Sequence, residues 1–135
     1  MKGAKSRHKP DLNTYNIIIY SYARAGDLEK MEWSLGRMEA AFFKPNLATY
    51  EFLVIGYAHA GAFQLMLERL TDILEAGEKP RLATLRAILE AYCKHNLFEE
   101  AEELLYKVKN WFKRPNAPLY LIVLRYQPNS SPYTL

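Results

Sequence analysis

Hydrophobic residues recur along this chain at the three- and four-residue spacing that places side chains on one face of an α-helix. One stretch shows this spacing at Leu12, Tyr15, Ile18, Ile19 and Tyr22. The next shows it at Leu28, Met31, Leu35, Met38 and Phe42. Later stretches match the second one, at Phe63, Met66, Leu70 and Ile73 and at Phe98, Ala101, Leu105 and Val108. The pattern predicts a series of amphipathic helices.

Residues that favour turns separate these helices at regular positions. The two helices of each pair meet at a residue that tolerates positive φ, which is Gly26, Gly61 or Asn96. Each second helix should stop before a proline, because proline disfavours helical geometry in the residue ahead of it. These prolines are Pro45, Pro80 and Pro115. Short polar side chains that can cap a first helix stand at Asp11, Asn46 and Asn116.

The helix pairs repeat every 35 residues without an insertion, as the series Thr14, Thr49 and Thr84 shows. One pair is too small to bury both of its apolar faces, so neighbouring pairs must stack. We therefore predict an all-α fold, an α-solenoid of antiparallel helix-turn-helix repeats. The expected repeats are about 12–46, 47–81 and 82–116, with a partial fourth at 117–126. Residues 1–10 are expected to be a basic leader or the remnant of a preceding repeat, and 127–135 a flexible tail.

Composition adds three limits to this picture. No apolar run reaches the roughly 18 residues that span a bilayer, so no membrane association is expected. Cys93 is the only cysteine, which predicts a reducing setting and a packed thiol. The net charge is +3, but four of the 18 basic residues lie in the first ten positions and none of the 15 acidic ones does. The array itself is thus nearly neutral.

Nothing in the pattern of reactive residues indicates catalysis. The histidines His8, His59 and His95 are scattered, and no glycine-rich phosphate loop or metal-binding spacing occurs. We expect no enzyme activity, no metal and no cofactor. The repeated tyrosines could suggest a stacking platform, but their helical spacing favours packing in the core.

One basic residue stands at the end of each first helix, at Arg24, His59 and Lys94. Their 35-residue spacing places them in one row of a solenoid, where they could follow a phosphate backbone. Cations also suit the negative end of a helix dipole, so ordinary solvated charges are the alternative.

The residues TYN at 14–16, ARAG at 23–26 and KPN at 44–46, on a period of 35, resemble the pentatricopeptide-repeat family of organellar RNA-binding helical arrays. The resemblance covers about residues 9–125. It implies a right-handed superhelix that binds single-stranded RNA along its first helices, with about one base per repeat. It also implies a chloroplast or mitochondrial location and a role in RNA processing, stability, splicing or translation.

The resemblance further implies which side chains meet the RNA. The base-reading pairs would be Asn16 with Asn46, Glu51 with Arg81, and Arg86 with Asn116. The residues that sandwich each base would be Asn13, Ala48 and Ala83. An Asn–Asn pair suggests a pyrimidine, whereas Glu51 and Arg86 depart from the family pattern. Leu121 stands at the reading position of the fourth repeat and has no hydrogen bond to offer a base. We therefore expect this repeat to cap the array.

Two alternatives stay open at this point. Asn46 and Asn116 are explained equally well by helix capping alone. The whole array could also be a protein-interaction scaffold that keeps the fold without base reading, as Glu51, Leu121 and the small residues at 48 and 83 suggest. Three repeats would touch only three or four nucleotides, so we expect weak RNA binding by this chain alone and a need for further repeats or a protein partner.

Overall fold

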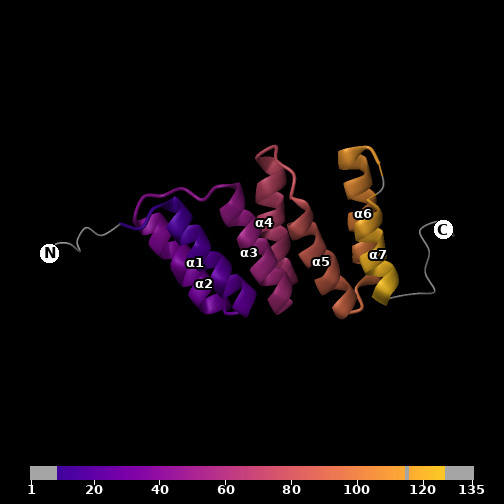
Figure 1. Cartoon of the computed structure of the whole chain (residues 1–135), viewed down its shortest axis with the longest axis horizontal. Coiled ribbons are helices and arrows are strands. Elements are labelled where there is room, and N and C mark those ends of the chain that lie inside the picture. Colours follow the sequence, from indigo (N-terminus) through magenta and orange to yellow (C-terminus); the bar gives the residue numbers. More distant parts are fainter. Residues whose placement is uncertain (1–8, 115, 127–135) are drawn as a thin grey trace.

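The computed structural model describes residues 9–114 and 116–126. In these residues the chain forms helices and no strand. The helices are α1 (Leu12–Ala25), α2 (Leu28–Ala40), α3 (Leu47–Ala60), α4 (Phe63–Glu75), α5 (Leu82–Lys94), α6 (Phe98–Phe112) and α7 (Ala117–Tyr126). They follow one another along a single row (Figure 1). The predicted all-α class is confirmed.

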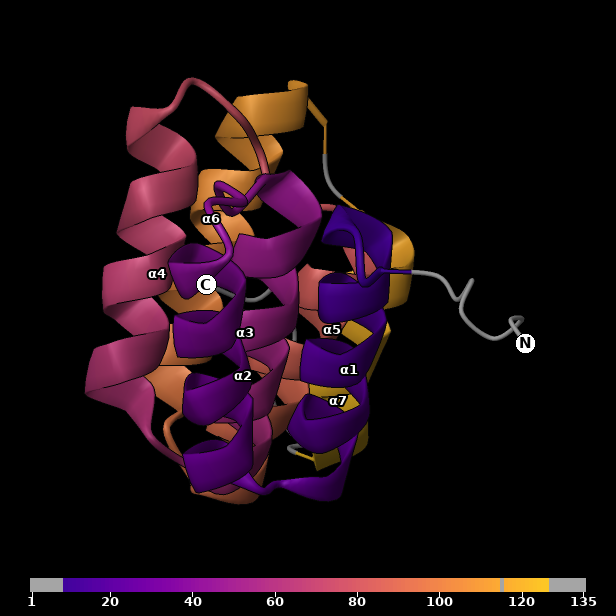
Figure 2. The ribbon, with the colours of Figure 1, turned by 90° about the vertical axis from the view of Figure 1, so that its left-hand side faces the viewer.

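The row has two layers. Viewed along the array, the first helices α1, α3, α5 and α7 lie on one side, and the second helices α2, α4 and α6 lie on the other (Figure 2). Each first helix packs against the first helix of the next unit, α1 on α3, α3 on α5 and α5 on α7. Neighbouring units therefore share one continuous core, as the prediction of a solenoid requires.

The core lies between the layers, and the central first helices α3 and α5 each bury eight residues in it. In α3 these include the unbroken run from Leu53 to Ala58. The helix α3 is apolar on all sides because neighbouring helices cover all of its sides. These neighbours are α1, α4 and α5. Tyr57 and Tyr92 are 2% and 6% exposed, which confirms that these tyrosines belong to the core.

The expected core position of Ile18 is wrong. Its side chain is 37% exposed, and its neighbour Ile17 is 65% exposed. Among the described residues, helices pack against α1 only from α2 and α3, so the opposite side of α1 faces outward. Ala23, which the spacing did not single out, is fully buried instead.

The turns between paired helices confirm the expected left-handed residues. Gly26 and Gly61 both have φ of 72°, and Asn96 has φ of 60°. At each turn the N–H of the residue after the left-handed one donates to the carbonyl of the buried or half-buried tyrosine five residues earlier, as Asp27 does to Tyr22. This closes the end of the first helix.

The ends of the second helices bring a second correction. Phe42 was expected on the apolar face of α2, but α2 ends at Ala40 and Phe42 is 93% exposed with φ of 67°. The left-handed residue turns the chain so that Phe43 packs instead, with its ring centroid 5.8 Å from that of Tyr15. Gly77 takes the same conformation in the second unit.

The expected helix caps are confirmed at three positions. The side chain of Asp11 accepts a hydrogen bond from the Thr14 N–H at 2.9 Å, and that of Asn46 accepts one from the Thr49 N–H at 3.0 Å. Asn116 accepts one from the Leu119 N–H at 3.2 Å. At Asp11 the hydrogen bonds from Thr14 also lower the pKa of the carboxyl. The helix α5 begins after Arg81, which has no capping side chain of its own.

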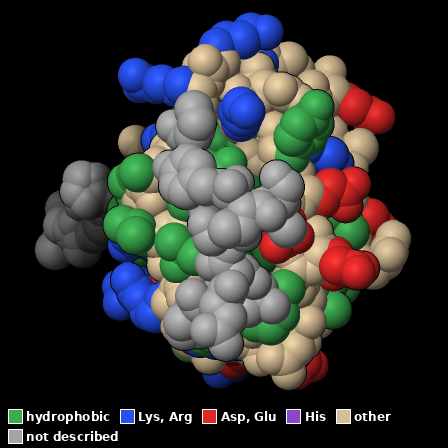
Figure 3. All heavy atoms as spheres, turned by 90° about the vertical axis from the view of Figure 1, so that its right-hand side faces the viewer, with side chains coloured by type: hydrophobic (Ala, Val, Ile, Leu, Met, Phe, Trp, Pro, Cys, Tyr) green, Lys and Arg blue, Asp and Glu red, His purple; other side chains and the backbone are tan. Residues whose placement is uncertain are grey.

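The far end of the array is formed by α6 and α7. Hydrophobic side chains lie at the surface there, with basic and acidic groups around them (Figure 3). The most exposed are Tyr106 at 63%, Leu121 at 58% and Phe112 at 46%. Leu119, Ile122 and Val123 of α7 are buried against the rest of the array, so this single helix covers the outer side of α5.

Two other expectations concern single features. Cys93 is 2% exposed, so its thiol is packed as predicted, and burial raises its pKa. In the part of the chain that the structure covers, no helix combines the length and the apolar character needed to cross a membrane. The predicted leader and tail fall almost wholly on residues 1–8 and 127–135, outside the described residues.

Candidate nucleic-acid interface

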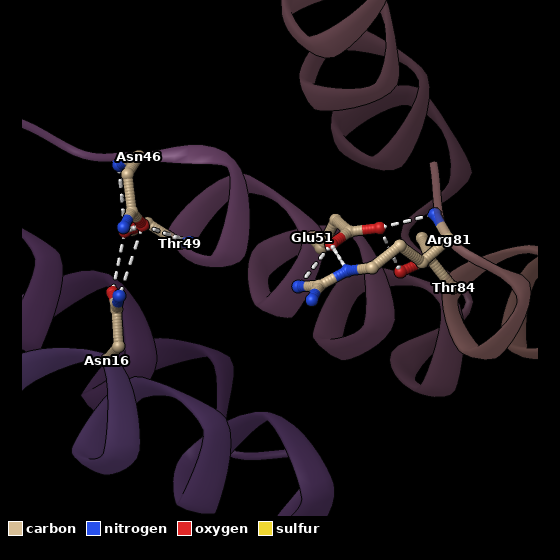
Figure 4. Close-up of polar contacts among 6 residues, drawn as sticks. All are labelled: Asn16, Asn46, Thr49, Glu51, Arg81 and Thr84. Atoms are coloured by element: carbon tan, nitrogen blue, oxygen red, sulfur yellow. Dashed lines mark hydrogen bonds and ion pairs between the residues drawn. The ribbon is translucent and has the colours of Figure 1, made fainter. Parts of the chain in front are cut away.

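A polar cluster joins α1 to the start of α3. The side-chain amide of Asn16 donates to Asn46 Oδ1 at 3.1 Å, and the Thr49 hydroxyl lies 2.6 Å from Asn16 Oδ1. The Asn46 N–H in turn donates to the Thr49 hydroxyl at 3.1 Å. Asn16 is only 5% exposed. The two residues of the first predicted reading pair are therefore in direct contact (Figure 4).

The second cluster occupies the same place one unit later, between α3 and α5 (Figure 4). Glu51 Oε1 accepts a hydrogen bond from Arg81 Nε at 2.6 Å and lies 2.6 Å from Arg81 Nη2. Glu51 Oε2 accepts from the Arg81 backbone N–H at 2.6 Å and from the Thr84 hydroxyl at 2.9 Å. The second predicted pair is thus also in contact, through an ion pair instead of two amides.

The third predicted pair differs from the first two. Arg86 is exposed, and no hydrogen bond links it to Asn116 among the residues that are described. The repeated threonine of this row is replaced by Leu119, which is fully buried and offers only its backbone N–H to Asn116. The other two clusters each include the hydroxyl of the repeated threonine, bonded to Asn16 and Asn46 in the first and to Glu51 in the second, and the third position has no such group.

The predicted sandwiching residues lie near the starts of the same first helices. Asn13 and Ala83 are exposed, and Ala48 is half-buried. Each is three residues before a predicted reading residue, so the two lie on one face of their helix. The structure therefore places both sets on the same row of the array, and their role in base contact stays a prediction.

The basic row gathers around a single hollow of about 360 Å³ at the other end of the first helices. Arg24, His59 and Lys94 are all exposed and all line it. Glu90 and His95 line it too, and neither was expected to belong to this row. Glu90 stands four residues before Lys94, a helical spacing that could have signalled it.

His95 is held in a defined orientation beside this row. Its Nδ1 lies 2.9 Å from the Ala91 carbonyl oxygen, and its ring meets the edge of Phe63 with centroids 5.1 Å apart. A Cβ at Gly61 would come within 3.0 Å of His95 Nε2, so the turn of one unit fits closely against the turn of the next.

A second hollow, of about 550 Å³, lies between the starts of α5 and α7. Arg81 and Asn116, one residue from each of two predicted pairs, both line it, together with Lys79 and Arg114. Those two additional cations precede first helices, and they recur with Lys9 and Lys44 every 35 residues, a periodic signal that could have identified them. In the described part of the chain no group of three metal-binding side chains comes together.

Comparison with known proteins places this arrangement among helical-repeat structures. A family model described as a pentatricopeptide repeat domain matches residues 6–58, and one described as a PPR repeat matches residues 83–111. Together the two matches cover more than half of the chain. No curated protein matches.

Solved structures of one protein are similar. The crystal structure of the pentatricopeptide repeat protein PPR10 from maize superposes with a TM-score of 0.72 at 22% identity, covering 91% of this chain and 18% of that protein. PPR10 in complex with an 18-nt psaJ RNA element gives a TM-score of 0.67 at 29% identity, covering 82% and 16% respectively. This chain thus spans less than a fifth of the length of PPR10.

Proposed function

Because the chain belongs to the pentatricopeptide-repeat family, we propose that it binds single-stranded RNA along the row of its first helices. The observation that carries the proposal is the recurrence of a polar cluster at the starts of α3 and α5, 35 residues apart, with a row of exposed cations at the other end of the first helices. The similarity to PPR10, which was solved in complex with an RNA element, supports the same proposal.

The two ends of the first helices would make different contacts. Amide groups such as those of Asn16 and Asn46 present both donors and acceptors, which suits the hydrogen-bonding edge of a base. Arg24 and Lys94 offer only donors and lie in the open, which suits phosphate oxygens. We propose one base per unit at the clusters and the backbone along the basic row.

We further propose that the chain acts as part of a larger protein in a chloroplast or mitochondrion, in RNA processing, stability, splicing or translation. Three units give few contacts, and at about 1–3 kcal/mol per stacked base the small side chains Ala48 and Ala83 leave the affinity low. Further repeats or a protein partner would raise it.

A protein-interaction scaffold is the second candidate. It is favoured by the burial of Asn16 and Glu51, whose polar atoms are already bonded within the protein. The exposed Leu121 and Tyr106 at the far end offer an apolar surface of the kind that protein partners cover.

The test is fluorescence anisotropy with labelled RNA and DNA oligomers of about ten nucleotides across a salt series. Three or four phosphate contacts on a single strand predict a slope of log affinity against log salt of about −2 to −3. The double variant Arg24→Glu with Lys94→Glu should abolish RNA binding, and Asn16→Ala should weaken it where a pyrimidine is present.

The matched control is Arg37→Glu with Lys109→Glu, which makes the same charge change on the second helices α2 and α6. It should leave most of the affinity in place. If the two double variants lost equal amounts of RNA affinity, the interaction would depend on net charge alone. No binding to RNA at low salt would favour the protein scaffold.

A further inference from the structure

We infer that the second unit recognises guanine through Arg81, whose guanidinium is held in one orientation by the buried carboxylate of Glu51. This inference rests on the proposed RNA binding and specifies one nucleotide of its ligand. It concerns the pair in which this chain replaces two amides by an acid and a base, Glu51 and Arg81, at the position of Asn16 and Asn46.

The carboxylate of Glu51 is fixed on every side. It is 1% exposed, and both of its oxygens are occupied. Oε1 accepts a hydrogen bond from Arg81 Nε and lies 2.6 Å from Arg81 Nη2. Oε2 accepts hydrogen bonds from the Arg81 backbone N–H and the Thr84 hydroxyl. An acid in this state has no free acceptor to offer a base. Its remaining effect is to hold the arginine.

The guanidinium uses only one of its two edges in this contact. Nε and Nη2 face Glu51, and in the described residues no protein group accepts a hydrogen bond from Nη1. The Arg81 side chain is 63% exposed. A guanidinium is planar with five N–H donors, so the second edge, formed by Nη1 and the outer hydrogen of Nη2, presents two parallel donors to solvent.

Two parallel donors require two adjacent acceptors. Guanine presents N7 and O6 side by side, and a bidentate arginine is the commonest specific contact to that edge. Adenine puts a donor beside its N7 acceptor on the same edge, so one of the two hydrogen bonds would be lost. Cytosine in a single strand also exposes two adjacent acceptors, N3 and O2, so cytidine is the decisive comparison with guanosine. Phosphate also offers adjacent oxygens, but a phosphate contact would be the same for every base.

The surroundings of Arg81 provide space for a base. The hollow of about 550 Å³ that it lines also has apolar walls from Leu82 and Phe112, which are 49% and 46% exposed. The exposed apolar side chains could stack on the face of a nucleobase while the fixed donor pair of Arg81 binds the edge of the same base. Lys79 and Arg114 at the same hollow would balance the charge of the adjacent phosphates.

The experiment compares ten-nucleotide RNAs that are uridine throughout except for one central position, occupied by uridine, adenosine, cytidine or guanosine. In a uniform background the strand can shift until the single different nucleotide meets the unit that prefers it. The guanosine RNA should bind about fivefold tighter or more than the adenosine and uridine RNAs. Arg81→Lys keeps the charge but loses the second donor edge, so it should remove most of that ratio.

Glu51→Gln should also lower the guanosine-to-adenosine ratio, because a neutral amide with one acceptor oxygen holds the arginine less firmly. General destabilisation would weaken all four RNAs together and leave the ratio unchanged, so the ratio separates orientation from folding. Arg37→Lys is the matched control, an arginine on α2 that should leave the ratio as it is.

Each other outcome overturns the inference in a distinct way. RNA binding without a guanosine preference, with cytidine equal to guanosine, or with a preference that survives Arg81→Lys would refute it and leave the proposed RNA binding in place. Failure of all four RNAs to bind would refute the proposed RNA binding itself, and the inference with it.

Discussion

Glu51, in the second turn of α3, accepts a hydrogen bond at 2.6 Å from the backbone N–H of Arg81, the residue before α5. The residues that precede the other first helices, Asp11, Asn46 and Asn116, each accept the N–H of the third residue of their own helix. Arg81 has no such capping side chain, and its own N–H is bonded to the neighbouring unit instead. One side chain therefore contributes both to the start of a helix and to the contact between two units.

We expect Glu51→Ala to lower the free energy of unfolding by about 1–3 kcal/mol, because the Arg81 N–H and the Thr84 hydroxyl lose their acceptor. Glu51→Gln retains one acceptor oxygen and should lose less. Urea unfolding followed by circular dichroism measures both. Glu39→Ala, at an exposed site on α2, should change stability by no more than about 0.5 kcal/mol. Equal effects at the two glutamates would contradict this role of Glu51 at the junction.

The close packing around Gly56 predicts that replacing it by alanine lowers stability, whereas the same replacement at Gly36 raises it. A Cβ at Gly56 would lie 3.0 Å from Ala23 Cβ and overlap the Met31 sulfur, and both neighbours are fully buried. The strain should exceed the gain in helix propensity, so Gly56→Ala is expected to destabilise the protein by about 1–2 kcal/mol.

Gly36 is the matched control, in the exposed part of α2 with no atom within 4 Å of an added Cβ. Gly36→Ala should stabilise the protein by about 0.5–1 kcal/mol through helix propensity alone. Thermal unfolding of both variants gives the comparison. If Gly56→Ala were as favourable as Gly36→Ala, α1, α2 and α3 would not meet as closely as the structure shows.

The left-handed residue after α2 predicts a stabilising substitution. Phe42 has φ of 67° and is 93% exposed, so it bears the cost of that conformation without gaining from burial. Gly77, 35 residues later, takes the same conformation at no steric cost. Phe42→Gly should therefore stabilise the protein by about 1 kcal/mol. Gly77→Phe should destabilise it by a similar amount, and an opposite sign for either would refute the assignment.

The buried phenol of Tyr57 predicts a pH dependence of stability. Burial first, and then a hydrogen bond of 2.6 Å to Glu32, raise its pKa to about 12. A raised folded-state pKa gives stability that is complete below the ordinary value of about 10 and is lost as the pH rises toward 12. The stability difference between the natural protein and Tyr57→Phe should therefore shrink by about 1–2 kcal/mol between about pH 9 and 11.5.

Denaturant unfolding at the two pH values measures this difference, in which the other titrating groups cancel. Tyr106→Phe controls for the removal of an exposed phenol. A constant difference between the natural protein and Tyr57→Phe across this range would show that the hydroxyl is not held as described.

The sequence predicted the fold because one physical constraint recurs in it. The 35-residue spacing of apolar faces, turn glycines and caps leaves stacked helix pairs as the arrangement that buries every face, and Gly26, Gly61 and Asn46 behave as expected. The errors at Ile18 and Phe42 arose where spacing alone could not tell how far a helix extends or which of its sides a neighbour covers.

The candidate site was predicted less fully than the fold. Its residues were located by their register, but register does not show that Glu51 is bonded on both oxygens or that Arg81 keeps one edge free. Those features depend on a few tenths of an ångström between neighbouring helices. Lys79 was missed although it recurs with Lys9, Lys44 and Arg114 every 35 residues. His95 was not expected beside the basic row because it lies in a turn and has alanine at the same place in the other units.

The joint between the first and second units and the joint between the second and third units are held by different polar contacts. The first rests on neutral amides at Asn16 and Asn46, and the second on the charges of Glu51 and Arg81, whose guanidinium is largely in solvent. Salt screens a pair with one exposed partner in part and leaves an amide pair almost unaffected. Rising ionic strength should therefore weaken the second joint slightly and leave the first unchanged.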